Sequence, residues 1–384
     1  MTRSVLFLSL CVALCSSVLQ AQTTTAALSH VYVSNTPVNS SDNFINGYTV
    51  APDGSLTVID GTPYYAEESD ITVAQNQLLG IDKNVPSIDA FSIAADGAIT
   101  YLTSTDYAQY NPSDCGSAGW VFPDRTATDL YVMEFDGDCA NNTYESFATE
   151  PSGSVANLGV VNGGAGSFSG VYLPAVFLGN NQFAYEATNN SCMYSGISAF
   201  ERTSSGLLTS SSATTTLPDP PDGYRAYYPT MLATDPTNHV AIALWPVNPP
   251  GCSTASQQIG VFTADANGNL TTTDTSATMP STLVGSVNDL KITPAGDLLA
   301  AAGSAGLQVF HFNGASSVTV YTNLLTADPI SEMFWDRFNH LFALSPSTNK
   351  LHVFNVDGST ATEAPGSPYV INAPIHLAVW SPQQ

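Results

Sequence analysis

The sequence predicts an all-β fold, a seven-bladed β-propeller of four-stranded antiparallel blades. The main observation is a repeated unit in which a strand with an aromatic residue is followed by an Asp-Gly turn and another strand. Segments 46–57 and 88–100 both contain this unit, with Tyr48 and Phe91 in corresponding places. A repeat of roughly 40–55 residues built from short strands is typical of a propeller. A single blade cannot bury both of its faces, so the blades must stack in a ring.

Seven copies of the second and third strands of the unit can be aligned. The apolar second strands are segments 31–33, 78–81, 130–132, 183–185, 240–242, 298–300 and 341–343. The third strands carry a stripe of aromatic residues: Tyr48, Phe91, Phe147, Phe200, Phe262, Phe310 and Phe354. Bulky rings suit the space between twisted, stacked sheets, so we expect this stripe to form blade-to-blade core.

The two ends of the repeat predict how the ring closes. The first recognisable strand, 31–33, is of the second type, and segment 374–380 near the C-terminus is of the first, inner type. We therefore expect the C-terminal strand to join the N-terminal blade. Such closure removes the free sheet edges that invite aggregation.

Composition narrows the class of partner. The 384 residues are 43% hydrophobic, and 32 acidic against 8 basic residues give a formal net charge of −24. Nucleic acid and anionic membranes would be repelled by this charge, whereas cations and neutral ligands would not. We expect a monomer with a single propeller domain over residues 22–384, and no nucleic-acid partner.

Residues 1–21 have the pattern of a secretory signal peptide. Arg3 supplies the positive start, segment 5–18 is an apolar run, and Ala21 is a small residue suited to cleavage. The run is short for a membrane span, and no later segment reaches that length. The pattern predicts a secreted protein, extracellular or periplasmic, with no membrane insertion.

Four cysteines remain after cleavage, an even number in an oxidising compartment: Cys115, Cys139, Cys192 and Cys252. Two disulfides are the expected outcome, and three connectivities are open. We favour Cys115 with Cys139 and Cys192 with Cys252, because each pair would join loops of the same or neighbouring blades. A metal site is the rival interpretation, but no Cys-x-x-Cys spacing or adjacent His favours it.

Propeller topology predicts which loops share one face, namely those that enter the inner strands and those that leave the second strands. The polar residues expected on or near this face are Glu67, Glu68, Asp70, Asp82, Glu134, Asp136, Asp138, Glu186, Arg225, Tyr227, Asp289, Asp328, Glu332 and His376. All four cysteines belong to the same loops. Long loops braced by disulfides on a single face are suited to recognition.

Within this set, three carboxylates are candidates for catalysis. Asp82 and Glu134 occupy the same register on neighbouring blades, and Glu186 lies one position earlier on the next. Carboxylates held together raise one another's proton affinity, which would create a general acid and base for hydrolysis through an activated water. Solvated surface charge and a Ca²⁺ site are the alternatives. The Asp136-Gly137-Asp138 segment resembles part of a calcium loop, but the closing Glu is absent and a tight turn is favoured.

Two further residues complete the candidate catalytic set. Arg225, beside Tyr227, would orient a carbonyl or contact a sugar, and a structural cation on an aromatic ring is the alternative. His376 lies in the expected inner strand and would reach the central channel, unless it is an ordinary core histidine. The candidate catalytic residues are thus Asp82, Glu134, Glu186, Arg225 and His376.

Several turn and strand motifs carry a family resemblance. They are segment 31–35 (Val-Tyr-Val-Ser-Asn), the Asp-Gly-x-Leu-Thr turn at 53–57, and the Gly-Thr-Pro-Tyr and Gly-Ser-Pro-Tyr segments at 61–64 and 366–369. Together they resemble the lactonase-type propellers, a group that includes 6-phosphogluconolactonase-like and YVTN-like proteins. The resemblance implies a seven-bladed ring and, as an expectation, lactone hydrolysis at the channel mouth. No catalytic motif of those enzymes matches here residue by residue.

The basic residues argue against a phosphorylated substrate, which would require clustered Arg and Lys. The mature chain has only Lys83, Arg125, Arg202, Arg225, Lys291, Arg337 and Lys350, spread over different blades. A lactonase of this type would act on a neutral extracellular lactone. Two other hypotheses are open: a non-catalytic propeller that binds a glycan, peptide or surface partner on its disulfide-braced face, and a calcium-stabilised structural module.

Overall fold

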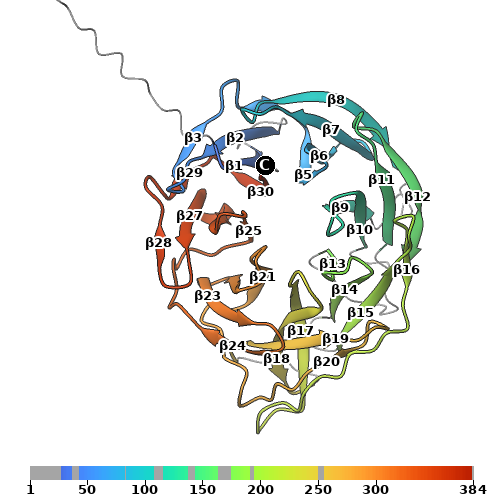
Figure 1. Ribbon diagram of the computed structural model, residues 1–384, viewed down its shortest axis with the longest axis vertical. Helices are drawn as coiled ribbons and strands as arrows, with labels where there is room; N and C mark the ends of the chain where they lie inside the picture. Colours follow the sequence, from blue (N-terminus) through green and yellow to red (C-terminus); the bar gives the residue numbers. More distant parts are fainter. Residues whose placement is uncertain are drawn as a thin grey trace, which may run out of the picture.

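A computed structural model of the chain describes residues 27–36, 43–82, 84–107, 116–136, 143–162, 174–190, 194–249 and 255–382. Seven antiparallel sheets stand in a ring around a central axis, with the chain running once around it (Figure 1). The described part contains no α-helix, and its one short 3₁₀ turn is η1 (Pro346–Thr348). The predicted seven-bladed propeller is confirmed.

Each blade has four strands, named here from the channel outward. Blade 1 contains β30 (Pro374–Trp380), β1 (Ser29–Asn35), β2 (Phe44–Val50) and β3 (Leu56–Val58), with β4 (Tyr64–Tyr65) also paired to β2. Blade 2 contains β5 (Glu68–Ala74), β6 (Gln77–Asp82), β7 (Ser87–Ile93) and β8 (Ile99–Asp106). Blade 3 contains β9 (Gly116–Pro123), β10 (Asp129–Asp136), β11 (Thr143–Thr149) and β12 (Val155–Asn162). Blade 4 contains β13 (Val176–Phe177), β14 (Phe183–Asn190), β15 (Tyr194–Arg202) and β16 (Leu208–Ser210).

The second half of the ring repeats this order. Blade 5 contains β17 (Ala226–Thr234), β18 (His239–Val247), β19 (Gln258–Ala264) and β20 (Leu270–Thr271). Blade 6 contains β21 (Val287–Ile292), β22 (Leu298–Gly303), β23 (Gly306–Asn313) and β24 (Ser316–Val320). Blade 7 contains β25 (Glu332–Trp335), β26 (His340–Ser345), β27 (Lys350–Val356) and β28 (Ala361–Glu363), with β29 (Tyr369–Val370) paired to β27.

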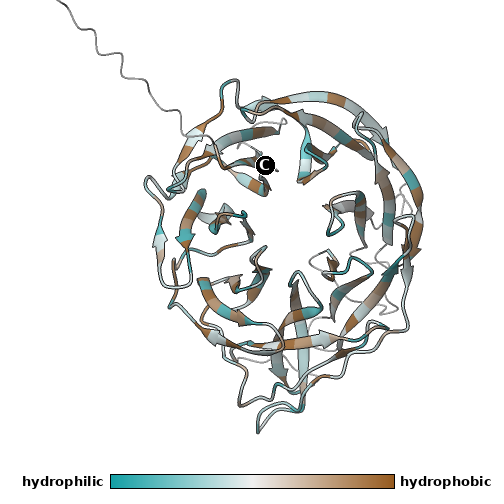
Figure 2. Ribbon diagram, viewed as in Figure 1, coloured by the Kyte–Doolittle hydropathy of each residue, from teal (hydrophilic) through white to brown (hydrophobic). Residues whose placement is uncertain are grey.

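The predicted strands and core positions are found where the sequence places them. All seven apolar segments lie in second strands, and the aromatic stripe lies in third strands. The six phenylalanines of the stripe are buried and Tyr48 is half-buried. Hydrophobic positions, drawn brown in Figure 2, recur along the strands of every blade. Burial of these rings between blades stabilises the ring.

The ring closes as predicted, through strands from opposite ends of the chain. β30 pairs with β1 in an antiparallel ladder that places His30 opposite Trp380 and Ser34 opposite His376. Because β1 then pairs with β2, blade 1 is a continuous sheet.

A tyrosine hydrogen bond links three pairs of neighbouring blades. The hydroxyls of Tyr32, Tyr131 and Tyr185, each in a second strand, donate to the carbonyls of Gly97, Gly206 and Gly268 at 2.7 Å. Each of these glycines occupies the turn between the third and fourth strands of the next blade and has a positive φ. The tyrosine therefore satisfies a buried hydroxyl while it holds two blades in register.

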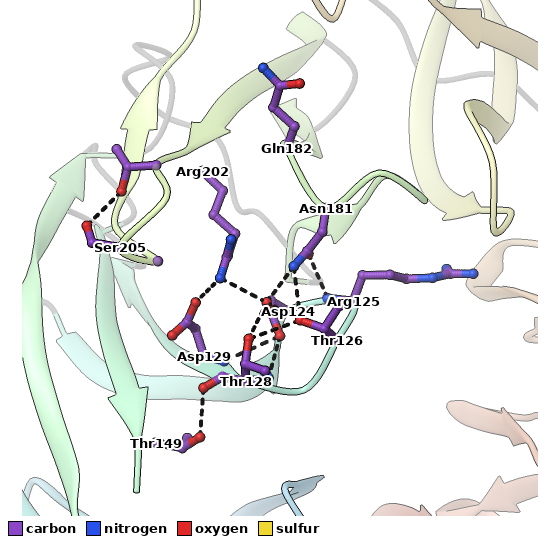
Figure 3. Close-up of polar contacts among 12 residues, drawn as sticks. Asp124, Arg125, Thr126, Thr128, Asp129, Thr149, Asn181, Gln182, Arg202 and Ser205 are labelled. Carbon is purple, nitrogen blue, oxygen red and sulfur yellow. Dashed lines mark hydrogen bonds and ion pairs between the residues drawn. The ribbon is translucent and has the colours of Figure 1, made fainter.

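Blades 3 and 4 are joined by a second polar cluster, centred on Asp124 (Figure 3). Asp124 accepts hydrogen bonds from the Thr128 N–H at 2.8 Å and from Asn181 Nδ2 at 2.6 Å. Arg202, from blade 4, lies 3.3 Å from Asp124 and also contacts Asp129. The guanidinium thus neutralises two largely buried carboxylates across the blade boundary.

Some predicted features fall outside the described residues. These are the signal segment 1–21, the four cysteines and Asp138. In the described part of the chain, no helix is long and apolar enough to cross a membrane.

Candidate functional site

The inner strands of all seven blades enclose a cavity of about 970 Å³ along the central axis. This volume is at the upper end of the range of ~300–1,000 Å³ that small-molecule sites occupy. The side chains that line it divide into two walls by the blade from which they come.

The charged wall is formed by blades 1, 2, 6 and 7, and its ionisable residues are His376, Asp70, Asp289, Lys291 and Glu332. The apolar wall is formed by blades 3, 4 and 5, and its residues are Trp120, Val121, Phe122, Val176, Phe177, Ala187, Met231, Leu232 and Trp245. The rest of the lining includes polar residues on blades 3 and 5, namely Asp124, Arg125, Thr230, Thr234 and Gln257, and apolar residues on the charged wall, such as Ile71, Phe334 and Ile375. The channel is therefore amphipathic across its width.

His376, on β30, is held between two carboxylates. Its Nδ1 lies 3.2 Å from Asp70 Oδ1 and 3.6 Å from Glu332 Oε2. Burial favours the neutral ring, but the charges of Asp70 and Glu332 outweigh it and raise the pKa of His376 to about 9. The imidazole is therefore a cation at neutral pH.

Asp70, the partner of His376, is buried and fully engaged. Its Oδ1 accepts the Ile71 N–H at 2.9 Å, and its Oδ2 accepts the Val121 N–H of β9 at 2.7 Å. Burial raises the pKa of Asp70 to about 6, with His376 acting in the opposite direction. Above that pH the two residues form an ion pair.

Asp289 and Lys291 form a second pair on β21. Lys291 Nζ lies 3.2 Å from Asp289 Oδ1 and 5.3 Å from the centre of the Phe334 ring, within the range of a cation–π contact. Burial raises the pKa of Asp289 to about 6, although Lys291 lowers it. The Met333 N–H donates to Asp289 Oδ2 at 3.0 Å.

The three carboxylates share a structural task. Each accepts an N–H from the inner strand of the next blade: Asp70 from Val121, Asp289 from Met333, and Glu332 from Leu377 at 2.8 Å. Inner strands have an unpaired edge toward the channel, and these bonds satisfy part of it.

Glu332 differs from the other two carboxylates in its second oxygen. Asp70 Oδ1 and Asp289 Oδ1 each contact a cation. Glu332 uses Oε2 for both of its contacts, and Oε1 accepts no hydrogen bond within the described residues. Its side chain is 22% exposed, so Oε1 is available to a water or a ligand.

The five residues predicted as catalytic are not brought together. Only His376 lines the channel. Glu134 is buried, and its charge adds to burial in raising the pKa of Tyr107 of blade 2. Glu186 is buried and accepts a hydrogen bond from Tyr144 of blade 3. Glu134 and Glu186 thus lie at blade boundaries, where each interacts with a tyrosine of the preceding blade.

The remaining two candidates lie at the ends of strands. Asp82 ends β6 and accepts the N–H groups of Asn84 at 2.6 Å and Val85 at 3.2 Å, which makes it a turn residue. Arg225 is exposed just before β17 and lines a separate surface hollow with Tyr224 and Asn248.

The sequence placed Asp70, Asp289 and Glu332 on the correct group of loops but did not single them out, and it treated Lys291 only as one scattered base. Their signal is position: Asp70, Asp289 and His376 are each the third residue of an inner strand, and Glu332 is the first of its strand.

Among the described residues, no group of three or more His, Cys, Asp or Glu side chains is placed to hold a metal ion. The side chain of Asp136 and all of Asp138 lie outside those residues. The Ca²⁺ site stays a prediction.

These features define a seven-bladed β-propeller with an amphipathic, ligand-sized channel. The fold is shared with a candidate 6-phosphogluconolactonase of Bacteroides uniformis, at a TM-score of 0.66 and 11% identity over 91% of this chain and 99% of that one. A candidate 6-phosphogluconolactonase of Bacteroides fragilis matches at 0.63 and 13% identity, over 93% and 99%. The periplasmic gluconolactonase of Pseudomonas aeruginosa matches at 0.63 and 13% identity, over 92% and 99%.

The resemblance to lactonase-type propellers inferred from the turn motifs is thus confirmed at the level of fold. A scan for known protein families finds no match to the sequence, and a search of curated proteins finds none either.

Proposed function

We propose that this protein is an exported hydrolase that opens an uncharged lactone at the charged wall of the channel. The observation that carries the proposal is the placement of Glu332, with an available Oε1, beside the cationic His376 on a cavity large enough for a small molecule. The lactonase names carried by the fold neighbours support the reaction class, and the signal-like segment 1–21 supports export.

The proposed reaction assigns Glu332 as general base and His376 as general acid. Glu332 Oε1 takes a proton from a water, whose oxygen bonds to the lactone carbonyl carbon. The ring C–O bond then breaks, and the departing alkoxide receives a proton from His376. The product is the open hydroxy acid, and transfer of the proton from Glu332 back to His376, through solvent, restores both groups.

The electrostatics favour an uncharged substrate. When ionised, the three carboxylates of the charged wall exceed its two cations, and the whole chain carries a net charge of −24. An anionic lactone would be repelled, and so would the hydroxy-acid product once its carboxylate forms.

The test is hydrolysis of a panel of uncharged and phosphorylated lactones by the purified protein, with Glu332→Gln and His376→Gln beside it. We expect turnover of uncharged lactones, and a loss of about 10²-fold or more in kcat for each variant. The role of His376 as general acid should also appear as a fall in kcat above pH 9, where His376 loses its proton.

Glu201→Gln, an exposed change on blade 4, serves as the control and should retain full activity. Loss of activity only in Glu134→Gln or Glu186→Gln variants that still fold would move the catalytic acid to the blade boundaries. Ligand binding without turnover would overturn the hydrolase and favour the binding propeller, for which the half-buried Trp120 and Trp245 offer surfaces to a sugar.

A further inference from the structure

The apolar wall has no role in the proposed hydrolysis, and it is the larger part of the channel lining on blades 3, 4 and 5. Four of its side chains, Trp120, Val176, Ala187 and Trp245, are half-buried. The surface that they leave uncovered faces the cavity rather than another blade. Binding of a ligand that removes apolar surface of this kind from water lowers the free energy.

The size of the cavity points in the same direction. A bare lactone ring would occupy only a part of about 970 Å³. With its carbonyl beside Glu332 and His376, such a ring would leave the apolar wall wet. The remaining volume leaves room for a substituent on the ring.

We propose that the substrate is an uncharged lactone with an alkyl or acyl arm, whose ring lies at the charged wall and whose arm lies along the apolar wall. The inference rests on the proposed function, because it takes the position of the ring from the assignment of Glu332 and His376.

Other kinds of arm fit the walls less well. A polyhydroxylated arm would find a few hydrogen-bond partners on blades 3 and 5, such as Arg125 and Thr230. Its other hydroxyls would lie against Val176, Ala187 and Met231, whose side chains offer none. An anionic arm would enter a channel whose carboxylates outnumber its cations. An apolar arm meets neither penalty.

The experiment measures binding separately from chemistry, with 2-alkyl tetrahydropyrans of increasing chain length, which lack the carbonyl and cannot be hydrolysed. Three of the four tryptophans, Trp120, Trp245 and Trp335, line the channel, so intrinsic fluorescence reports its occupancy. We expect the affinity to rise by up to about fourfold per added methylene until the arm reaches the end of the wall.

Val176→Ser and Val160→Ser make the same chemical change at two places. Val176 lines the channel, whereas Val160 is 38% exposed on the outer strand β12. We expect Val176→Ser to flatten the dependence on chain length, and Val160→Ser to leave it unchanged. Ala187→Ser provides a second, milder change of the wall if the first variant does not fold.

The outcomes separate the inference from the function beneath it. Affinity that does not change with chain length, or that both valine variants alter equally, would overturn the apolar arm. Lactone turnover with no chain-length preference would leave the hydrolase intact while it removes the inference. Chain-length-dependent binding with no turnover of any alkyl lactone would support the ligand class and contradict the hydrolase.

Discussion

At the scale of single residues, two carboxyl groups on β5 show how surroundings decide chemistry. Asp70 accepts hydrogen bonds from two N–H groups and pairs with His376, and burial raises its pKa to about 6. Glu68, two residues earlier, is 1% exposed, and neither of its oxygens has a hydrogen-bond partner among the described residues. Its side chain packs on Gly80, where a Cβ would stand 2.1 Å from the Glu68 Cγ. The glycine in this second strand is therefore required by the glutamate.

Glu68 should make the folded state less stable at high pH. Burial raises its pKa from 4.5 to about 8, so the folded state holds the proton more tightly than the unfolded chain. This contribution is complete below pH 4.5 and is lost as pH rises through 8. We expect Glu68→Gln, which cannot ionise, to be more stable than the unmodified protein at pH 9 by on the order of 3 kcal/mol.

The measurement is urea unfolding of both proteins at pH 5 and pH 9. Glu67→Gln is the matched control, because it makes the same change at the adjacent, only half-buried position. Equal loss of stability between pH 5 and pH 9 in the Glu68→Gln variant and the unmodified protein would contradict the argument.

Single residues of the sequence predict the fold, but they do not predict much of the candidate site. The aromatic stripe repeats because every blade boundary needs the same filling, and repetition is visible in one sequence. The convergence of Asp70, Glu332 and His376 depends on how inner strands of different blades lean toward one axis, which no local pattern encodes. For Glu134 the local pattern is informative, because Leu130 and Val132 lie on the same side of β10, in the core toward blade 2.

At the scale of elements, the turns between the first and second strands of blades 5 and 7 share one Asp–His motif. In blade 5, Asp235 Oδ1 accepts the His239 N–H at 3.0 Å and Oδ2 lies 2.8 Å from the ring Nδ1. In blade 7, Asp336 and His340 make the same contacts at 2.9 and 2.7 Å. The aspartate thus closes the turn from within, in the manner of an Asx turn, and the histidine is structural.

Blade 3 has the related aspartate, Asp124, and recruits an arginine from the next blade in place of the histidine. Arg202 has a side chain that is only 16% exposed, so its removal would leave Asp124 and Asp129 with like charges and no cation. We expect Arg202→Met to lower the free energy of unfolding by about 3 kcal/mol. Denaturant unfolding at pH 7 measures the change.

Arg202→Lys keeps the charge but loses the planar fork, and should recover part of this stability. If Arg202→Met were as stable as the unmodified protein, the cluster of Figure 3 would be a surface contact with little energetic weight.

At the scale of the whole molecule, closure by β30 makes the ring a single cooperative unit. β30 supplies the inner strand of blade 1 and contacts β5 and β25 on either side. It also carries His376 into the channel. The last segment of the chain therefore completes the fold and the candidate site together.

Deletion of residues 374–384 should consequently be far more damaging than its length suggests. It would leave β1 without its inner partner, expose the edges of two neighbouring blades, and free the Glu332 carboxylate from Leu377. We expect loss of cooperative thermal unfolding and of any channel activity. Circular dichroism melting measures this, with deletion of residues 383–384 as the control. A cooperative transition in the longer deletion would show that the ring does not need the inner strand of blade 1.

The same closure determines at which end of the ring a tether to a solid support would be attached. Because β1 and β30 are antiparallel, the chain enters β1 and leaves β30 at one end of the ring, with His30 and Trp380 side by side. The third residue of β30, His376, lies toward the opposite end, where the inner strands begin. A tether or fusion partner attached before Ser29 or after Trp380 would thus lie at the end of the ring where the inner strands finish. The end of the channel beside Glu332 and His376 would face away from it, into solution.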